Sequence, residues 1–172
     1  ALGAGESAEP RRLAKVAATQ NVVEAKSAGG DAWSAAERGL PLFGRDRLRT
    51  GPGSRAAILY AADTLHRIDE KSELEIVPPD DEGSGILKVL GGRHYFSSRK
   101  PKDFGRVETP TVTAAIKGTE FAVAVAANGA TTITMIEGVV AASNEFGEVE
   151  IGAGEQAVTE PGKAPVRSVV VR

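Results

Sequence analysis

The sequence predicts an all-β fold made of short strands, with little or no helix. The 172 residues include 20 glycines and nine prolines, and only 5% are aromatic, a composition that favours tight turns over long helices. Apolar residues alternate with small or polar ones on both sides of Asn128-Gly129, which is the strand period. Glycines and prolines also divide residues 39–53 into pieces too short for helices. We therefore expect a compact stack of strands, either β-helix-like or a β-sandwich.

The chain is predicted to contain one domain between a leader and a tail. Residues 1–12 have no apolar periodicity and are expected to form a flexible leader. Residues 13–160 form the all-β domain, which is long enough to bury a core. Residues 161–172 are a C-terminal tail or contain a last edge strand at residues 168–171.

The first half of the domain is expected to be a meander of strands. Residues 13–23 hold short β-compatible runs, and Gly29-Gly30 predicts a turn. Residues 31–38 contain helix formers, but eight residues are too few for a stable helix, so we expect strand and turn. Strands are predicted near residues 57–61, 65–68 and 74–77. Two prolines and three acidic residues predict a solvated loop over residues 78–85, which lacks the alternating acids of a calcium loop.

The second half is expected to contain strands separated by one basic loop and one tight hairpin. Residues 86–96 predict a strand, and residues 97–106 a basic loop. Asn128-Gly129 predicts a two-residue type I′ turn with positive φ at both residues. Between residues 113–116 and 121–125, the polar group Gly118-Thr119-Glu120 interrupts the apolar alternation. We interpret it as a β-bulge at which glycine allows close backbone approach and Thr119 and Glu120 satisfy unpaired backbone groups.

The composition excludes several functional classes. A net charge of −2 gives no basis for nucleic-acid binding, and no apolar run approaches the roughly 20 residues of a transmembrane helix. The chain has no cysteine, and its two histidines, His66 and His94, are expected in separate strands, exposed or half-buried, without forming a metal site. No catalytic, cofactor-binding or metal-binding residues are predicted.

One segment has the composition of an interaction surface. Basic residues alternate there with Tyr95, Phe96 and Phe104, and could dock a protein partner or an anionic envelope polymer. The alternative is a solvated loop whose aromatic residues enter the core. The candidate contact residues are Arg93, Tyr95, Arg99, Lys100, Lys102 and Arg106.

Several short motifs resemble, in order and spacing, the FecR-type domain, an extracytoplasmic bacterial module. They span about residues 15–160. The upstream part is Asp46-Arg47-Leu48-Arg49-Thr50-Gly51, which is similar to the G-D-x-[IL]-x-T-G stretch of the family, with its first glycine displaced to Gly44. The downstream motifs are Thr109-Pro110, Ile116-Lys117-Gly118-Thr119-Glu120-Phe121, Glu137-Gly138-Val139-Val140 and Gly154-Glu155-Gln156.

The resemblance implies an all-β module that binds rather than catalyses, as in the periplasmic part of anti-sigma regulators. The chain begins at Ala1 without a methionine, as cleavage of an export signal would leave it, so we expect a periplasmic or extracellular protein. The expected function is that of a sensor or scaffold acting by protein contact. Two alternatives are a structural subunit that assembles through its strand edges and a glycan-binding or glycan-cleaving module that uses Trp33.

Overall fold

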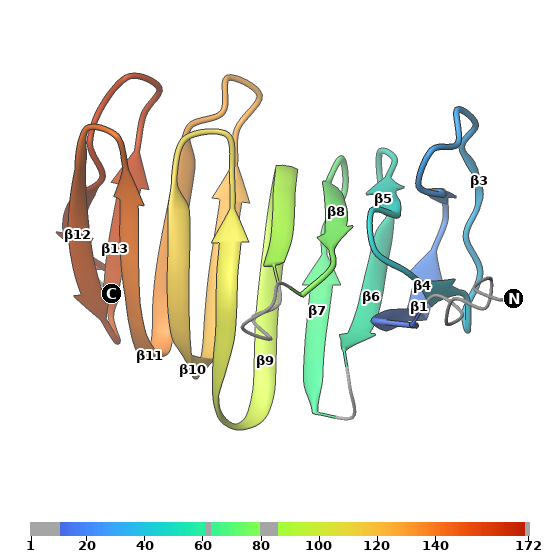
Figure 1. Cartoon of the computed structure of the whole chain (residues 1–172), viewed down its shortest axis with the longest axis horizontal. Coiled ribbons are helices and arrows are strands. Elements are labelled where there is room, and N and C mark those ends of the chain that lie inside the picture. The colour runs from blue at the N-terminus through green and yellow to red at the C-terminus, as the bar shows by residue number, and fades with distance from the viewer. Residues whose placement is uncertain (1–10, 61–62, 80–85, 171–172) are drawn as a thin grey trace, which may run out of the picture.

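The computed structural model describes residues 11–60, 63–79 and 86–170, which form one antiparallel sheet of fourteen strands (Figure 1). No helix occurs among these residues, so the all-β prediction is confirmed. The strands are β1 (Ala14–Gln20), β2 (Val23–Lys26), β3 (Ser34–Ala35), β4 (Pro41–Leu42), β5 (Arg47–Thr50), β6 (Arg55–Tyr60), β7 (Thr64–Ile68), β8 (Glu73–Val77), β9 (Ile86–Glu108), β10 (Thr113–Val125), β11 (Thr131–Asn144), β12 (Gly147–Gly152), β13 (Glu155–Thr159) and β14 (Val166–Val169).

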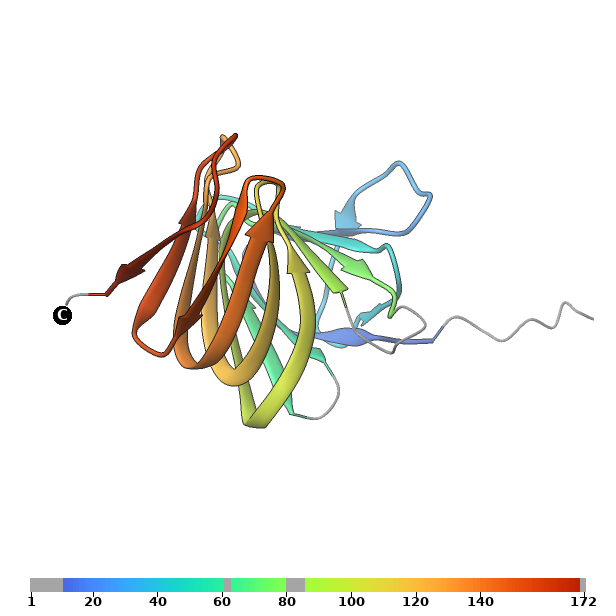
Figure 2. The same ribbon diagram turned by 60° about the vertical axis from the view of Figure 1, so that its left-hand side comes forward.

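The sheet folds over itself into two facing layers, because its longest strands bend and pass from one layer to the other (Figure 2). The first half of β11 pairs with β13, and its second half pairs with β12. What we call the continuous layer has the strand order β4-β1-β6-β7-β9-β10-β11-β13-β14. The sequence left a β-helix and a sandwich as alternatives. The structure is one continuous sheet whose described pairings are all antiparallel, with a sandwich-like interior.

The second layer, which we call the divided layer, consists of two parts. One part contains β3, β2, β5, β8 and the start of β9, and the other contains the end of β9 with β10, β11 and β12. Within the described ranges, no strand pairing joins these two parts. Both parts face the continuous layer across one hydrophobic core.

The core follows the predicted strand periodicity. In β10 the side chains of Phe121, Val123 and Val125 are buried, whereas Ala122 and Ala124 are partly exposed on the other side. Phe121 stacks on Phe96 of β9, with ring centroids 4.5 Å apart. Because the alternation holds in both halves of the bent strands, a single sheet can enclose the core from two sides.

Two sequence-based expectations about turns are wrong. The predicted loop at residues 97–106 lies within β9, where residues 98–101 bulge out opposite Thr119. The Asn128-Gly129 hairpin is not a type I′ turn, because only Gly129 has positive φ, at 94°. Ala126 donates to the carbonyl of Ala130 and Gly129 donates to the carbonyl of Ala126, so the loop is longer than two residues.

Most other local predictions agree with the structure, and some fall outside it. Residues 31–38 contain only the two-residue strand β3, without helix, and Gly29 has the positive φ of a turn residue. The last strand, β14, lies two residues earlier than the predicted edge strand and pairs with β13. The structure does not describe residues 1–10 of the leader or residues 80–85 of the acidic loop.

Candidate functional site

The Gly118 motif lies where β10 and β11 bend together. Gly118 is paired with Gly138, and the register of β10 shifts on both sides of it, as the predicted bulge requires. A Cβ atom on Gly118 would lie 2.7 Å from Cε of Met135 and closer still to the carbonyl oxygen of Glu137. Gly138 has φ of 124°, which other residues rarely adopt. Two facing glycines therefore let the backbones of the two strands approach each other at the bend.

The polar residues of this motif do not have the role expected of them. Thr119 Oγ1 is buried and has no hydrogen-bond partner among the described residues. Glu120 is half-buried and continues the strand opposite Ser97 and Glu137, without a side-chain hydrogen bond in the described part of the chain. The expectation that Thr119 and Glu120 satisfy unpaired backbone groups is wrong, because neither side chain forms a hydrogen bond with a described residue.

The Thr109-Pro110 motif lies in a tight turn that is hydrogen-bonded to the neighbouring hairpin. Thr109 Oγ1 accepts a hydrogen bond of 3.1 Å from the backbone N–H of Val112 and one of 2.9 Å from the hydroxyl of Thr131. The hydroxyl of Thr111 donates to the carbonyl of Gly129 at 2.9 Å. The motif therefore has a structural role, which is to hold the turn before β10 against the β10–β11 hairpin.

The upstream motif also binds backbone groups. The Asp46 carboxylate accepts hydrogen bonds from the backbone N–H groups of Phe43 at 2.8 Å and Ala28 at 3.2 Å. Thr50 Oγ1 donates to the carbonyl of Asp69 at 2.6 Å and accepts from the N–H of Ser72 at 3.0 Å. Asp46 and Thr50 thus connect the ends of β5 to turns that are distant in sequence.

A chain of buried polar side chains crosses the core of the continuous layer. The hydroxyl of Tyr60 lies 3.0 Å from Nδ1 of His66, and Nε2 of His66 lies 2.8 Å from Nδ1 of His94. Nε2 of His94 lies 2.8 Å from the carbonyl oxygen of Gly91, which can only accept. His94 therefore donates to Gly91, His66 donates to His94, and Tyr60 donates to His66. Every polar group of this chain is satisfied while both imidazoles are neutral.

Burial keeps the hydrogen-bonded side chains of Tyr60, His66 and His94 in their neutral forms. It lowers the pKa of His66 well below the ordinary value of 6.5, an effect that His94 reinforces, and lowers the pKa of His94 to about 4. Burial also raises the pKa of the Tyr60 hydroxyl above its ordinary value of 10. The two histidines lie in separate strands as predicted, but the prediction that they are exposed or half-buried is wrong. Each histidine lies two residues from a buried apolar residue, Ile68 or Phe96, and therefore on the same side of its strand. This spacing could have predicted that the histidines are buried.

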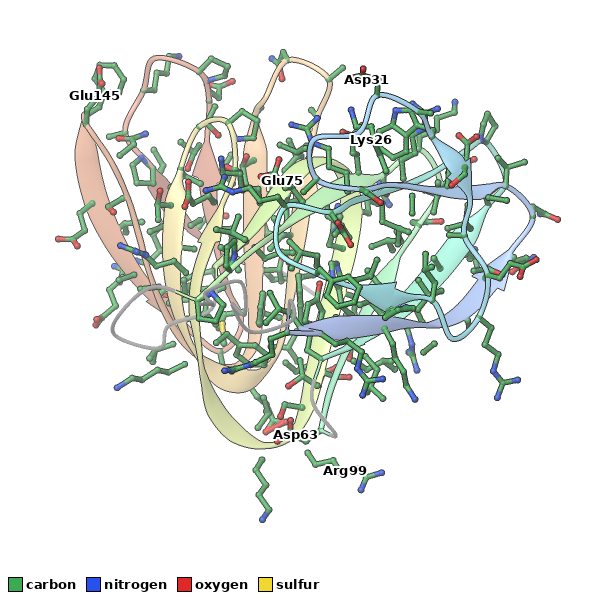
Figure 3. The ribbon with its side chains drawn as sticks, turned by 45° about the vertical axis from the view of Figure 1, so that its right-hand side comes forward. Lys26, Asp31, Asp63, Glu75, Arg99 and Glu145 are labelled. Atoms are coloured by element: carbon green, nitrogen blue, oxygen red, sulfur yellow. The ribbon has the colours of Figure 1, made fainter. Side chains whose placement is uncertain are left out.

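The candidate contact residues do not form one patch. Arg93 and Tyr95 are on the outer face of the continuous layer, whereas Arg106 pairs with Ala115 in the divided layer. Arg99 and Lys100 are exposed at the tip formed by the bulge of β9, where the Arg99 N–H donates to the carbonyl of Asp63 (Figure 3). Lys102 is opposite Gly118, but its side chain is outside the described structure. Of the interleaved aromatic residues, Phe96 and Phe104 pack in or against the core.

Arg93 and Tyr95 belong to an outer sheet surface that we call the Tyr95 face. Strand register places two rows of side chains across β9, β10 and β11. The rows are Arg93, Ala124 and Thr132, and Tyr95, Ala122 and Thr134. The Cζ of Arg67 on β7 lies 6.0 Å from the centroid of the Tyr95 ring. Small side chains thus flank one tyrosine and two arginines on an open sheet surface, and the next row on this face contains Ser97 and Glu120.

An open hollow of about 770 Å³ borders the Tyr95 face. Leu90, Gly91, Val125 and Ala126 are among its lining residues, and Arg93 contributes to both the hollow and the face. Asp69 and Glu70, which also line it, are engaged with Arg55 and the Gly53 N–H respectively. Lys71 and Arg93 have no ion-pair partner among the described residues, and Glu70 keeps its negative charge because its partner is a backbone N–H, so the hollow presents charges of both signs.

The glycan alternative depended on an accessible Trp33 ring. In the structure Trp33 is half-buried, the guanidinium of Arg49 lies 3.9 Å from its ring centroid and Lys26 Nζ lies 5.2 Å from it. The Arg49 guanidinium also forms a 2.9 Å ion pair with Glu24. One side of the indole is therefore occupied by a fixed cation, which weakens its case as a sugar-stacking platform.

Two classes of feature are absent from the described residues. No helix within them is long and apolar enough to cross a membrane. No group of three or more histidine, aspartate or glutamate side chains in the same residues could hold a metal ion.

The comparisons with known proteins agree with the motifs. Two crystal structures of a proposed anti-sigma factor from Parabacteroides distasonis are similar in fold, with TM-scores of 0.60 and 0.61 and 12% sequence identity. Each similarity covers 72% of this chain and 59% of the other, so the chain spans about three fifths of the length of these solved proteins. Among curated proteins, no relative matches. The model of the family described as FecR protein matches residues 46–141, which is more than half of the sequence, and the chain therefore belongs to the FecR protein family.

Proposed function

We propose that this chain is an exported, non-enzymatic module of the bacterial envelope that acts as a sensor or scaffold by binding another protein through its Tyr95 face. Membership of the FecR family and the fold shared with a proposed anti-sigma factor support a regulatory role based on protein contact. Export is part of the proposal and rests on the family resemblance.

The Tyr95 face is the observation that carries this proposal. Tyrosine and arginine are among the residue types that most often dominate binding energy at protein interfaces, and here they lie beside the small side chains of Ala122, Ala124 and Thr132. The exposed cation Arg93 also belongs to the hollow beside the face. A partner that presents an apolar segment with a carboxylate would match the small side chains of the sheet surface and the exposed Arg93 guanidinium.

The side chains most suited to chemistry have structural partners, which supports binding over catalysis. Asp46, Thr50 and Thr109 hold backbone groups, and the two histidines are hydrogen-bonded inside the core. A general acid or base must reach its substrate, and these imidazoles are enclosed by the sheet.

Site-specific photo-crosslinking in the native host tests the proposal. A photoreactive residue at Ala122 or Ala124, on the Tyr95 face, should give one discrete crosslinked product, and Tyr95→Ala should remove it. The matched control is the same residue at Ala115, which is exposed on the divided layer. Equal products from both surfaces, or no product from the Tyr95 face, would contradict the proposal. Fractionation of the same cells tests export, because the protein should be in the periplasmic or extracellular fraction.

A further inference from the structure

The two ends of the folded sheet differ in charge, although the whole chain is nearly neutral. β1, β3 and β4 lie at one end of the long axis, and β12, β13 and the C-terminus lie at the other (Figure 1). Residues 11–42, at the first end, contain five basic and three acidic residues, and residues 1–10, which the structure does not describe, add Glu6 and Glu9 to the sequence. Residues 144–170, at the second end, contain five acidic and two basic residues. We call these the basic end and the acidic end.

The charges that distinguish the two ends are exposed and have no ion-pair partner within the described structure. At the acidic end, Lys163 and Arg167 are engaged with Glu160 and Glu155, at 3.3 and 3.7 Å. The uncompensated carboxylates are those of Glu145, Glu148 and Glu150. At the basic end the uncompensated cations are Arg11, Arg12, Lys15 and Arg38, and the exposed acids Asp31 and Glu37 offset only part of this charge.

Each end also carries a strand edge without a pairing partner. β14 pairs only with β13, and its Val166 and Val169 are 61% and 67% exposed. At the basic end, Ala18, Thr19 and Gln20 of β1 pair only with β6, since β4 covers just Ala14 and Lys15. Natural edge strands are normally protected by charges, prolines or bulges, and two exposed valines on β14 are unusual in that setting.

From these two observations we propose that copies of this chain associate end to end, with the acidic end of one copy against the basic end of the next. The contact would place β14 beside the free edge of β1 and bring carboxylates opposite guanidinium and ammonium groups. The two contacting surfaces are different, so every dimer keeps one free acidic end and one free basic end and can grow. This inference does not depend on the proposed function, because the Tyr95 face lies between the ends.

The alternative contact between copies is a symmetric dimer through two β14 edges. Such a dimer would bring two acidic ends together, and the repulsion between Glu145, Glu148 and Glu150 of the two copies would oppose it. The charge pattern therefore favours the end-to-end arrangement, and the two arrangements respond differently to mutation.

Two variants with one altered end each give a direct test. Arg12→Glu with Lys15→Glu inverts the basic end, and Glu148→Lys with Glu150→Lys inverts the acidic end. All four side chains are exposed and unpaired in the described structure, so folding should be unaffected. Arg99→Glu with Lys100→Glu is the control, because it inverts two exposed cations on β9, which lies between the two ends (Figure 1).

The measurement is sedimentation velocity of the purified protein over a concentration series. In about 0.01 M salt, where the Debye length is about 30 Å, the unaltered protein and the control should form species that grow with concentration. In about 1 M salt, where the Debye length is about 3 Å, these species should dissociate. Each end variant alone should associate at least about tenfold more weakly than the unaltered protein.

Mixing the two end variants distinguishes the end-to-end contact from the symmetric β14 dimer. Each variant keeps one intact end, and the two inverted ends are again opposite in charge, so an equimolar mixture should form species that grow with concentration although neither variant does so alone. A monomer at all concentrations in low salt would overturn the proposal, as would a mixture that stays monomeric. Dimerisation of the basic-end variant alone would instead indicate the symmetric β14 contact and would equally overturn it.

Discussion

The bend at Gly118 and the Tyr60–His66–His94 chain are both places where the core departs from simple aliphatic packing, and they depend on different parts of the chain. At the bend, Gly118 and Gly138 bring two backbones together, and any side chain would obstruct them. In the histidine chain, three polar side chains from β6, β7 and β9 satisfy one another inside the sheet. The first depends on a missing side chain and the second on the presence of three.

This difference predicts that the histidine chain tolerates substitution better than the bend does. Backbone atoms at the bend cannot move independently of the strand pairings on either side, so an added group is expected to cost a large part of the stability. The histidine chain can lose one hydrogen bond and keep its packing, because the His66 imidazole also stacks on Phe96, with ring centroids 4.0 Å apart, and lies 5.0 Å from the His94 ring. Substitutions in the histidine chain should therefore reduce the free energy of unfolding by less, and the reduction should depend on pH.

Gly118→Val should have the largest effect, a loss of at least about 4 kcal/mol in the free energy of unfolding. The new side chain would meet the Glu137 carbonyl and Met135 on the paired strand, and neither lies at a flexible surface. Urea denaturation measures the change. Gly91→Ala is the matched control, because a Cβ atom there has nothing within 4 Å, and it should change stability by less than about 1 kcal/mol. Similar losses in both variants would show that close backbone approach is not the cause.

Acidification should have the next largest effect, through the histidine chain. The folded-state pKa of His94 is about 4 and the ordinary value is 6.5, so the unfolded chain binds more protons below pH 6.5. The contribution of neutral His94 to the free energy of unfolding is fully present above pH 6.5 and is lost as the pH falls towards 4. The loss is about 3 kcal/mol for His94 alone. Denaturation curves at several pH values measure this loss. The double variant His66→Phe with His94→Leu should show a flatter dependence over the same interval, and an unchanged slope would contradict the assignment.

Tyr60→Phe should destabilise the protein by about 1–2 kcal/mol at neutral pH. The substitution removes the hydroxyl that donates to Nδ1 of His66 and leaves a buried acceptor without a partner, while the ring stays in place. Denaturation at pH 7 measures the loss. A neutral effect would mean that His66 adopts the other tautomer or that water replaces the hydroxyl.

The sequence was sufficient to predict the bend and insufficient to predict the histidine chain, for a physical reason. A bulge at Gly118 is a local property, signalled by a glycine between two alternating apolar runs. Contact between His66 and His94 requires the register of β7 on β9, which pairs His66 with Phe96 across an intervening strand and loop. For the same reason, only part of the Tyr95 face could be predicted from the sequence. Arg93 and Tyr95 are neighbours along β9, whereas Ala122 and Thr134 join them only through strand pairing.

The smallest effects should come from the polar residues of the bend, and they should differ in sign. Thr119 Oγ1 is buried without a partner among the described residues, so Thr119→Val should stabilise the protein by about 0.5–1 kcal/mol by removing a desolvated hydroxyl. Glu120→Ala should cost less than about 1 kcal/mol, since its half-buried side chain makes no hydrogen bond within the described structure. Thermal denaturation of both variants beside Gly118→Val measures the series. If Thr119→Val were destabilising, a water or a backbone group would have to satisfy the hydroxyl, and the bend would then depend on its polar side chain as well as on its glycines.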